Sequence, residues 1–174
     1  MPLVDVVIDP VALALLGCLE DALDAHDSAV TNISLRAGDQ TELLLALGRD
    51  ECCEGTAWVR TITWYPTDNF PEPLATFNRC APRMWALVLE MGVARCAPMG
   101  TATDLPSSAE WNAAVGQVNT DAAAMQCAAQ CLAELDDERM VLVGQWLPTR
   151  TEGGCIGGTL QVTVSALPCN CQQP

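Results

Sequence analysis

Ten cysteines and a single histidine are the residues of this sequence whose types and spacing could support chemistry. A structural zinc site needs Cys and His ligands at short spacing, but the chain has no C-x-x-C pair and only His26 beside its thiols. C-x-x-x-C at 127–131 and C-x-C at 169–171 could contribute to a thiolate site. We favour small buried residues of which some pairs oxidise: Cys18, Cys52, Cys53, Cys80, Cys96, Cys127, Cys131, Cys155, Cys169 and Cys171.

Nucleophilic catalysis lacks a base. A Ser or Cys nucleophile is usually activated by a histidine, and His26 is expected at the end of an acidic helix as a surface or capping residue. No G-x-S-x-G motif occurs, and the glycine-rich segment 152–158 lacks phosphate-loop spacing. The chain contains no lysine, which excludes a Schiff base. We therefore expect no enzymatic activity, no cofactor and no metal.

Length and charge narrow the classes of protein further. The 174 residues fit a single structural domain, 1–174, and a hydrophobic fraction of 50% allows a sizeable core. A formal net charge of -14 would repel phosphates, which excludes a general nucleic-acid binder. The first nine residues lack the basic start of a secretory signal, and no apolar run is long enough for a membrane span. We expect assembly in a cytoplasm and no membrane partner.

Local patterns predict the elements that must position these residues. Asp9-Pro10 predicts the start of a helix over 10–26, and a capping box at Ser107 and Glu110 opens a second helix that ends near Leu135. Strands are expected over 31–36, 41–47, 57–65, 84–94, 140–147 and 159–166, with a hairpin loop at 49–55, long loops at 66–82 and 149–158, and a loose tail at 168–174.

The second helix carries two stripes. The larger residues predict a core stripe that packs on a sheet, and a stripe of small residues lies more than about 90° away around the axis. The small stripe indicates a second packing partner, although an alanine-rich helix explains it equally well. The core stripe is Trp111, Ala114, Val118, Ala122, Met125, Ala129 and Leu132, and the small stripe is Ala113, Gly116, Thr120, Ala124, Cys127 and Cys131.

The element order α, β, β, β, β, α, β, β predicts an α+β fold, a mixed or mostly antiparallel sheet with two helices packed on it. If 57–65 pairs antiparallel with 84–95, Cys96 lies near the Cys52–Cys53 segment. Cys80 would lie at the other end of these strands, beyond reach at about 3.3 Å per residue. We therefore predict a disulfide between Cys96 and either Cys52 or Cys53.

Three segments carry a family resemblance: DPVAL at 9–13 leading to Cys18-Leu19, GRDECCEG at 48–55 followed by AWVR at 57–60, and EGGC at 152–155. Together they resemble a small cysteine-bearing structural protein encoded among the head-to-tail genes of actinobacterial phages with long non-contractile tails. The resemblance covers most of the chain. It indicates a viral group rather than a chemistry.

The resemblance implies a virion protein of the phage neck, and the element order is most similar to the tail terminator, which works as a hexameric ring. Such a ring caps the tail tube protein and docks the head-to-tail stopper, while genomic DNA passes an acidic lumen without specific binding. The long loops 66–82 and 149–158 are candidate contacts. So are six small residues: Gly116, Thr120, Cys127, Cys131, Gly153 and Gly154.

The cysteine count exceeds what a ring protein needs. Oxidation after the virion leaves the cell would turn the thiols into covalent staples of the neck. Two alternatives stay open. One is another neck or tail component, a stopper or a tube-like subunit, and the other is a non-viral metal or redox module that uses the cysteines.

Overall fold

The structure is a computed structural model that describes residues 8–37, 52–74, 84–100, 103–149, 151 and 154–166. The predicted strand 41–47 and tail 168–174 lie outside the described residues, as do most of the predicted hairpin loop and Gly153. The described chain has the predicted α+β fold, with two helices and one five-stranded mixed sheet. No described helix is long and apolar enough to cross a membrane.

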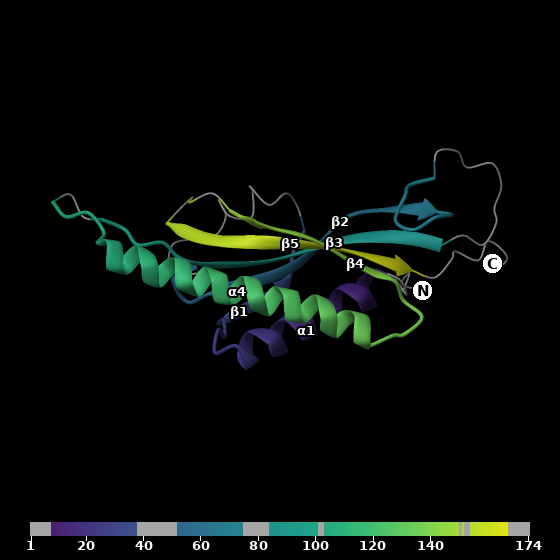
Figure 1. Ribbon diagram of the computed structural model, residues 1–174, viewed down its shortest axis with the longest axis horizontal. Coiled ribbons are helices and arrows are strands. Elements are labelled where there is room, and N and C mark those ends of the chain that lie inside the picture. The colour runs from purple at the N-terminus through teal and green to yellow at the C-terminus, as the bar shows by residue number, and fades with distance from the viewer. Residues whose placement is uncertain are drawn as a thin grey trace, which may run out of the picture.

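The sheet has the strand order β1-β2-β3-β5-β4 (Figure 1). Only β1 and β2 run parallel, and every other neighbouring pair is antiparallel. The antiparallel pairing of 57–65 with 84–95, which the disulfide prediction assumed, is therefore present. The bounds are β1 (Asn32–Leu35), β2 (Thr56–Thr67), β3 (Met84–Cys96), β4 (Val141–Pro148) and β5 (Cys155–Ala166).

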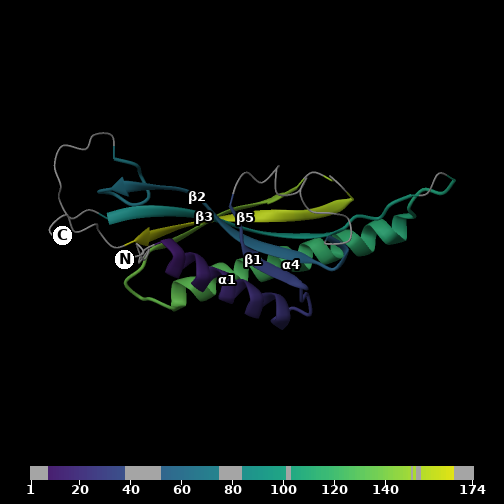
Figure 2. The same cartoon turned by 180° about the vertical axis from the view of Figure 1, so that it is seen from behind.

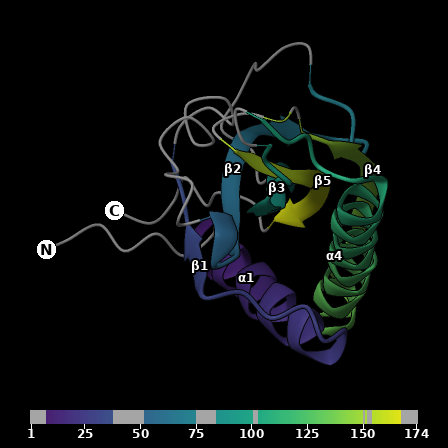
Figure 3. The ribbon, with the colours of Figure 1, turned by 90° about the vertical axis from the view of Figure 1, so that its left-hand side faces the viewer.

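Both helices lie on the same face of the sheet, α1 (Ile8–Ala25) under β1 and β2 and α4 (Ser108–Glu134) under β5 and β4 (Figures 2 and 3). The capping box at the start of α4 is present: the Glu110 amide donates to Ser107 Oγ, and the Ser107 amide donates to the Glu110 carboxylate. Two residues after the end of α1, Asp27 has a left-handed conformation with φ 54°. The next amide, that of Ser28, donates to the Leu23 carbonyl and so closes the helix end.

The core fills the space between the sheet and the two helices. Alternate residues of the central strands face it, because successive side chains of a strand point to opposite faces. In the sequence of the last strand, Leu160, Val162 and Val164 alternate with Gln161, Thr163 and Ser165, and the three apolar residues are fully buried. Their main partners on β3 and the helices are Leu87, Leu89, Met91, Val93, Leu15, Leu19, Leu23, Met125 and Leu132.

Strand β5 begins at Cys155, four residues earlier than predicted, because its glycines pair with β3 instead of forming a flexible connection. A Cβ atom added at Gly157 would stand 1.9 Å from the Val93 carbonyl oxygen, and one at Gly158 would stand 2.3 Å from the Trp146 ring. These glycines permit close approach of neighbouring backbone and ring. The glycine-rich composition that predicted a loop at 149–158 reflects tight packing at Gly157 and Gly158.

The predicted core stripe of α4 is correct only where the helix has the sheet above it. Val118, Met125 and Leu132 are buried, but Trp111 is exposed, so its prediction as a core residue was wrong. Figure 1 shows the first turn of α4 extending past the sheet. Trp111 therefore has the right helical position but no strand to pack against.

Candidate functional site

Within the residues that the structure describes, three disulfides join distant parts of the chain. Cys53 bonds Cys96, one of the two predicted pairings, with a Cα–Cα distance of 4.2 Å. Cys52 bonds Cys155 at 5.7 Å between Cα atoms. The third links the two helices, Cys18 of α1 to Cys131 of α4, at 5.8 Å.

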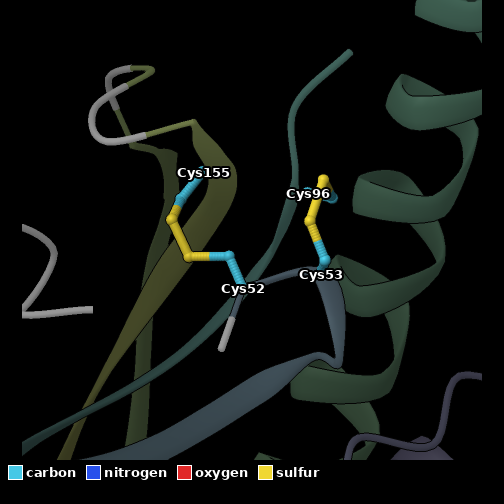
Figure 4. Close-up of a disulfide and its surroundings, with 4 residues drawn as sticks. All are labelled: Cys52, Cys53, Cys96 and Cys155. Carbon is cyan, nitrogen blue, oxygen red and sulfur yellow. A yellow bond between two sulfur atoms is a disulfide. The ribbon is translucent and has the colours of Figure 1, made fainter. Parts of the chain in front are cut away.

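Two of these bonds form one cluster, drawn in Figure 4. Cys52 and Cys53 are adjacent in sequence, and their partners Cys155 and Cys96 face each other in the β3–β5 ladder. The start of β2 is thereby tied to the ends of two other strands. The cluster is structural: Cys52 and Cys155 pack with Trp58 in a small apolar core. No group of three or more His, Cys, Asp or Glu residues suited to a metal occurs in the part of the chain that the structure describes.

The candidate contact residues on α4 differ in their exposure and in their bonding partners. Gly116 is exposed, and its carbonyl accepts a hydrogen bond from the Thr120 hydroxyl. Cys127 is an exposed free thiol, 3.4 Å from Nε2 of His26. Cys131 is bonded to Cys18 and so faces α1 instead of a partner chain. The small stripe therefore meets α1 over its C-terminal half.

The candidate Gly154 is a turn residue inside the fold. It is buried, its φ of 84° lies in the left-handed region that favours glycine, and its carbonyl accepts the Ala97 amide at 2.7 Å. The described half of this glycine pair therefore serves the turn into β5 and offers no open contact surface.

A buried ion pair holds α4 to the rest of the domain, and the sequence interpretation missed it. Asp121 is 1% exposed and accepts two hydrogen bonds from the Arg95 guanidinium, 3.0 Å from Nε and 2.8 Å from Nη2. Arg95 also donates to the Ala29 carbonyl, and Ser28 Oγ donates to Asp121. One signal was available, because Asp121 lies three residues after Val118 and four before Met125, on the core side of the helix.

A second buried pair lies on the opposite face of the sheet. Arg60 Nε donates to a Glu90 carboxylate oxygen at 2.7 Å, between register partners of β2 and β3. Both side chains are largely buried, so their charges compensate each other within the sheet. Each pair joins two elements that are distant in the sequence.

Among the described residues, the outer face of α4 from Trp111 to Ala133 and strand β4 carry no exposed charge. From Trp111 to Ala133 the sole ionisable carboxylate of α4 is the buried Asp121, and strand β4 has no charged residue. Trp111 and Val115 each lie about 160° around the helix axis from Cys131, so they point away from α1. We call this surface the α4/β4 side, and define it by the exposed apolar residues on the helix side of the sheet: Trp111, Val115 and Val143. Leu142 and Leu147 of β4 are exposed on the opposite face, because they lie in register with Thr163 and Thr159 and not with the helix-facing Val162 and Leu160.

The two components of the α4/β4 side are continuous. Trp146 of β4 and Ala114 of α4 pack against one apolar cluster that includes Val118. Strand β4 is the last strand of the sheet on this side (Figure 3). An edge strand without charged residues next to a helix face without exposed charges is the type of surface that proteins use for association.

Comparison with known proteins adds no identity. The sequence matches no protein-family model and no curated protein.

Proposed function

We propose that the chain is a structural protein of a phage neck, a tail terminator that forms a hexameric ring on the end of the tail tube. The proposal combines the family resemblance of the sequence with the described α+β fold, two helices on one sheet. The observation that carries it is the α4/β4 side. A chain with net charge -14 resists self-association wherever its carboxylates meet, so its subunits must join through a surface without charge.

A neck ring must also let DNA pass through its lumen without binding it, and the exposed acidic residues suit this requirement. Helix α1 exposes four carboxylates, those of Asp9, Glu20, Asp21 and Asp24. A ring whose lumen carried such carboxylates would repel the phosphates of passing DNA at short range and would not retain it. In this proposal the partners are further copies of the chain, the tail tube protein and the head-to-tail stopper.

The disulfides suit a particle that leaves the cell. Three crosslinks stabilise the described domain where reducing conditions no longer hold. In this proposal the thiols are reduced during assembly in the host cytoplasm and oxidise in the virion.

The test is the mass of the purified protein by light scattering, with metal content measured on the same sample. We expect a metal-free protein that is hexameric alone, or that becomes hexameric with tail tubes of the phage that encodes it, and ring-shaped particles by negative-stain electron microscopy. A zinc-loaded monomer that ignores the tubes would overturn the proposal in favour of a cysteine-based metal module.

A further inference from the structure

A closed ring needs two different complementary surfaces on each copy, because its repeated contact is heterologous. The α4/β4 side can supply only one of them. The second must also be free of charge, since a carboxylate buried against the apolar α4/β4 side would lose its hydration without a partner.

The described chain has such a surface in the distal parts of β2 and β3. We call residues 61–67 and 84–88 the arm; neither segment contains a charged residue. Ile62, Trp64 and Met84 are exposed there, with Trp64 at 49%. Figure 1 shows β2 and β3 continuing past the ends of both helices, so no helix covers the far end of the arm, while Leu87 at its inner end packs in the core.

Trp64 has the features of an interface anchor. Its ring contacts that of Trp85, with centroids 4.6 Å apart, so its position is supported by a neighbour in the same sheet. It pairs in register with Leu87, which faces the helices nearer the centre of the domain. Large aromatic side chains held in place but exposed are frequent centres of protein–protein contacts.

We propose that the arm of one copy docks on the α4/β4 side of the next copy, and that this contact builds the ring. The occupant is a second copy because both surfaces lack charge in a strongly acidic chain, which lets identical subunits approach without opposing carboxylates. The arm and the first turns of α4 lie at opposite ends of the long axis (Figure 1), so one copy cannot make the contact within itself. This inference rests on the proposed function.

The test uses Val115→Glu on the α4/β4 side and Ile62→Glu on the arm, with Leu13→Glu as a matched control. Leu13 is an apolar residue of the acidic helix α1 whose exposure is close to that of Val115. Sedimentation velocity of the full-length protein, at low and high sodium chloride, measures the assembly. We expect V115E and I62E each to weaken association about 100-fold or more, and L13E to assemble like the unmodified chain.

Mixing the two defective variants distinguishes this contact from others. V115E keeps an intact arm and I62E keeps an intact α4/β4 side, so an equimolar mixture should form a one-to-one dimer and stop there. Normal assembly of the single variants, or a mixture that stays monomeric, would overturn the proposed docking contact. Neither result would contradict the proposal that the unmodified chain forms a ring. Failure of the unmodified chain to form rings, alone or on tail tubes, would overturn the proposed function as well.

Far-UV circular dichroism checks that each variant is folded. If a glutamate variant is unfolded, Val115→Ser and Ile62→Ser replace it, with an expected weakening of about 10-fold and the same dimer in the mixture. Wild-type assembly by both serine variants would count against the contact.

Discussion

Helix α1 presents four carboxylates to solvent, at Asp9, Glu20, Asp21 and Asp24, whereas α4 presents none between Trp111 and Ala133. Both helices pack on the same face of the sheet and share one apolar core. Packing therefore does not dictate the difference, because it constrains only the inward faces. The outer faces were free to diverge, so that one is acidic and the other carries no exposed charge between Trp111 and Ala133.

The means of attachment differ as well. Helix α1 is held by apolar side chains along its length and by the bond from Cys18. Helix α4 carries that bond on Cys131 but also has the buried Asp121, paired with Arg95 of β3. A buried charge fixes one arrangement of its partners, because any other would leave it unpaired. This pair therefore sets where the α4/β4 side stands relative to the sheet.

The largest effect is expected when this pair is broken. Arg95→Met leaves the Asp121 carboxylate buried without its partner, and should lower the free energy of unfolding by about 3–5 kcal/mol in urea titrations. Arg139→Met is the control: Arg139 pairs with the more exposed Asp136, and its loss should cost about 0.5 kcal/mol or less. Equal losses in the two variants would show that Asp121 does not anchor α4.

The link between the helices is the next test. The double variant Cys18→Ala/Cys131→Ala removes a bond that spans 113 residues, and should cost about 2–4 kcal/mol of unfolding free energy. Cys127→Ala, which alters an exposed free thiol one turn away on α4, should change stability by about 0.5 kcal/mol or less. If adding a reductant destabilises the double variant as much as the unmodified protein, the helix–helix bond is not the stabilising one.

A smaller effect is expected at the start of α4. Ser107→Ala removes the side-chain half of the capping box and should lower Tm by about 2–4 °C at neutral pH, while Ser108→Ala should leave it unchanged.

This effect should depend on pH. Hydrogen bonds from the backbone and side chain of Ser107 lower the pKa of Glu110. A carboxyl with a lowered folded-state pKa stabilises the fold above its ordinary pKa, and that contribution disappears as the pH falls through the lowered value. The Tm difference between the unmodified chain and S107A should therefore narrow on acidification. A difference that is constant across the titration would contradict the role of Glu110.

The smallest effect sharpens the contrast between the outer faces. Glu20 and Asp24 are like charges four residues apart near the C-terminal end of α1, where acids are unfavourable. Glu20→Gln/Asp24→Asn should raise Tm by about 1–2 °C at low salt and by less at high salt. Gln126→Glu/Gln130→Glu, the mirrored change on α4, should lower it similarly. If the first variant shows no rise in Tm, the acidic residues of α1 do not destabilise the fold.

Local chemistry determined much of this protein from the sequence alone. The capping box fixes the start of α4 because its hydrogen bonds join residues three apart, Ser107 and Glu110. Alternation along the last strand identified its buried face for the same local reason. Antiparallel pairing of β2 and β3 was assumed from adjacent strand patterns, and it placed Cys96 near the Cys52–Cys53 segment, of which Cys53 is the partner.

Only the tertiary structure decided the contacts between distant elements. The partner of Cys52 is Cys155, which requires β5 to lie next to β3, and the glycines that permit this pairing have the composition of a loop. Trp111 occupies a core position by helical period, yet it is exposed because the sheet ends before it. Arg95 and Asp121 are 26 residues apart and meet only when α4 crosses under the sheet. Periodicity reports which way a side chain points along its own element, and the fold alone sets what it meets there.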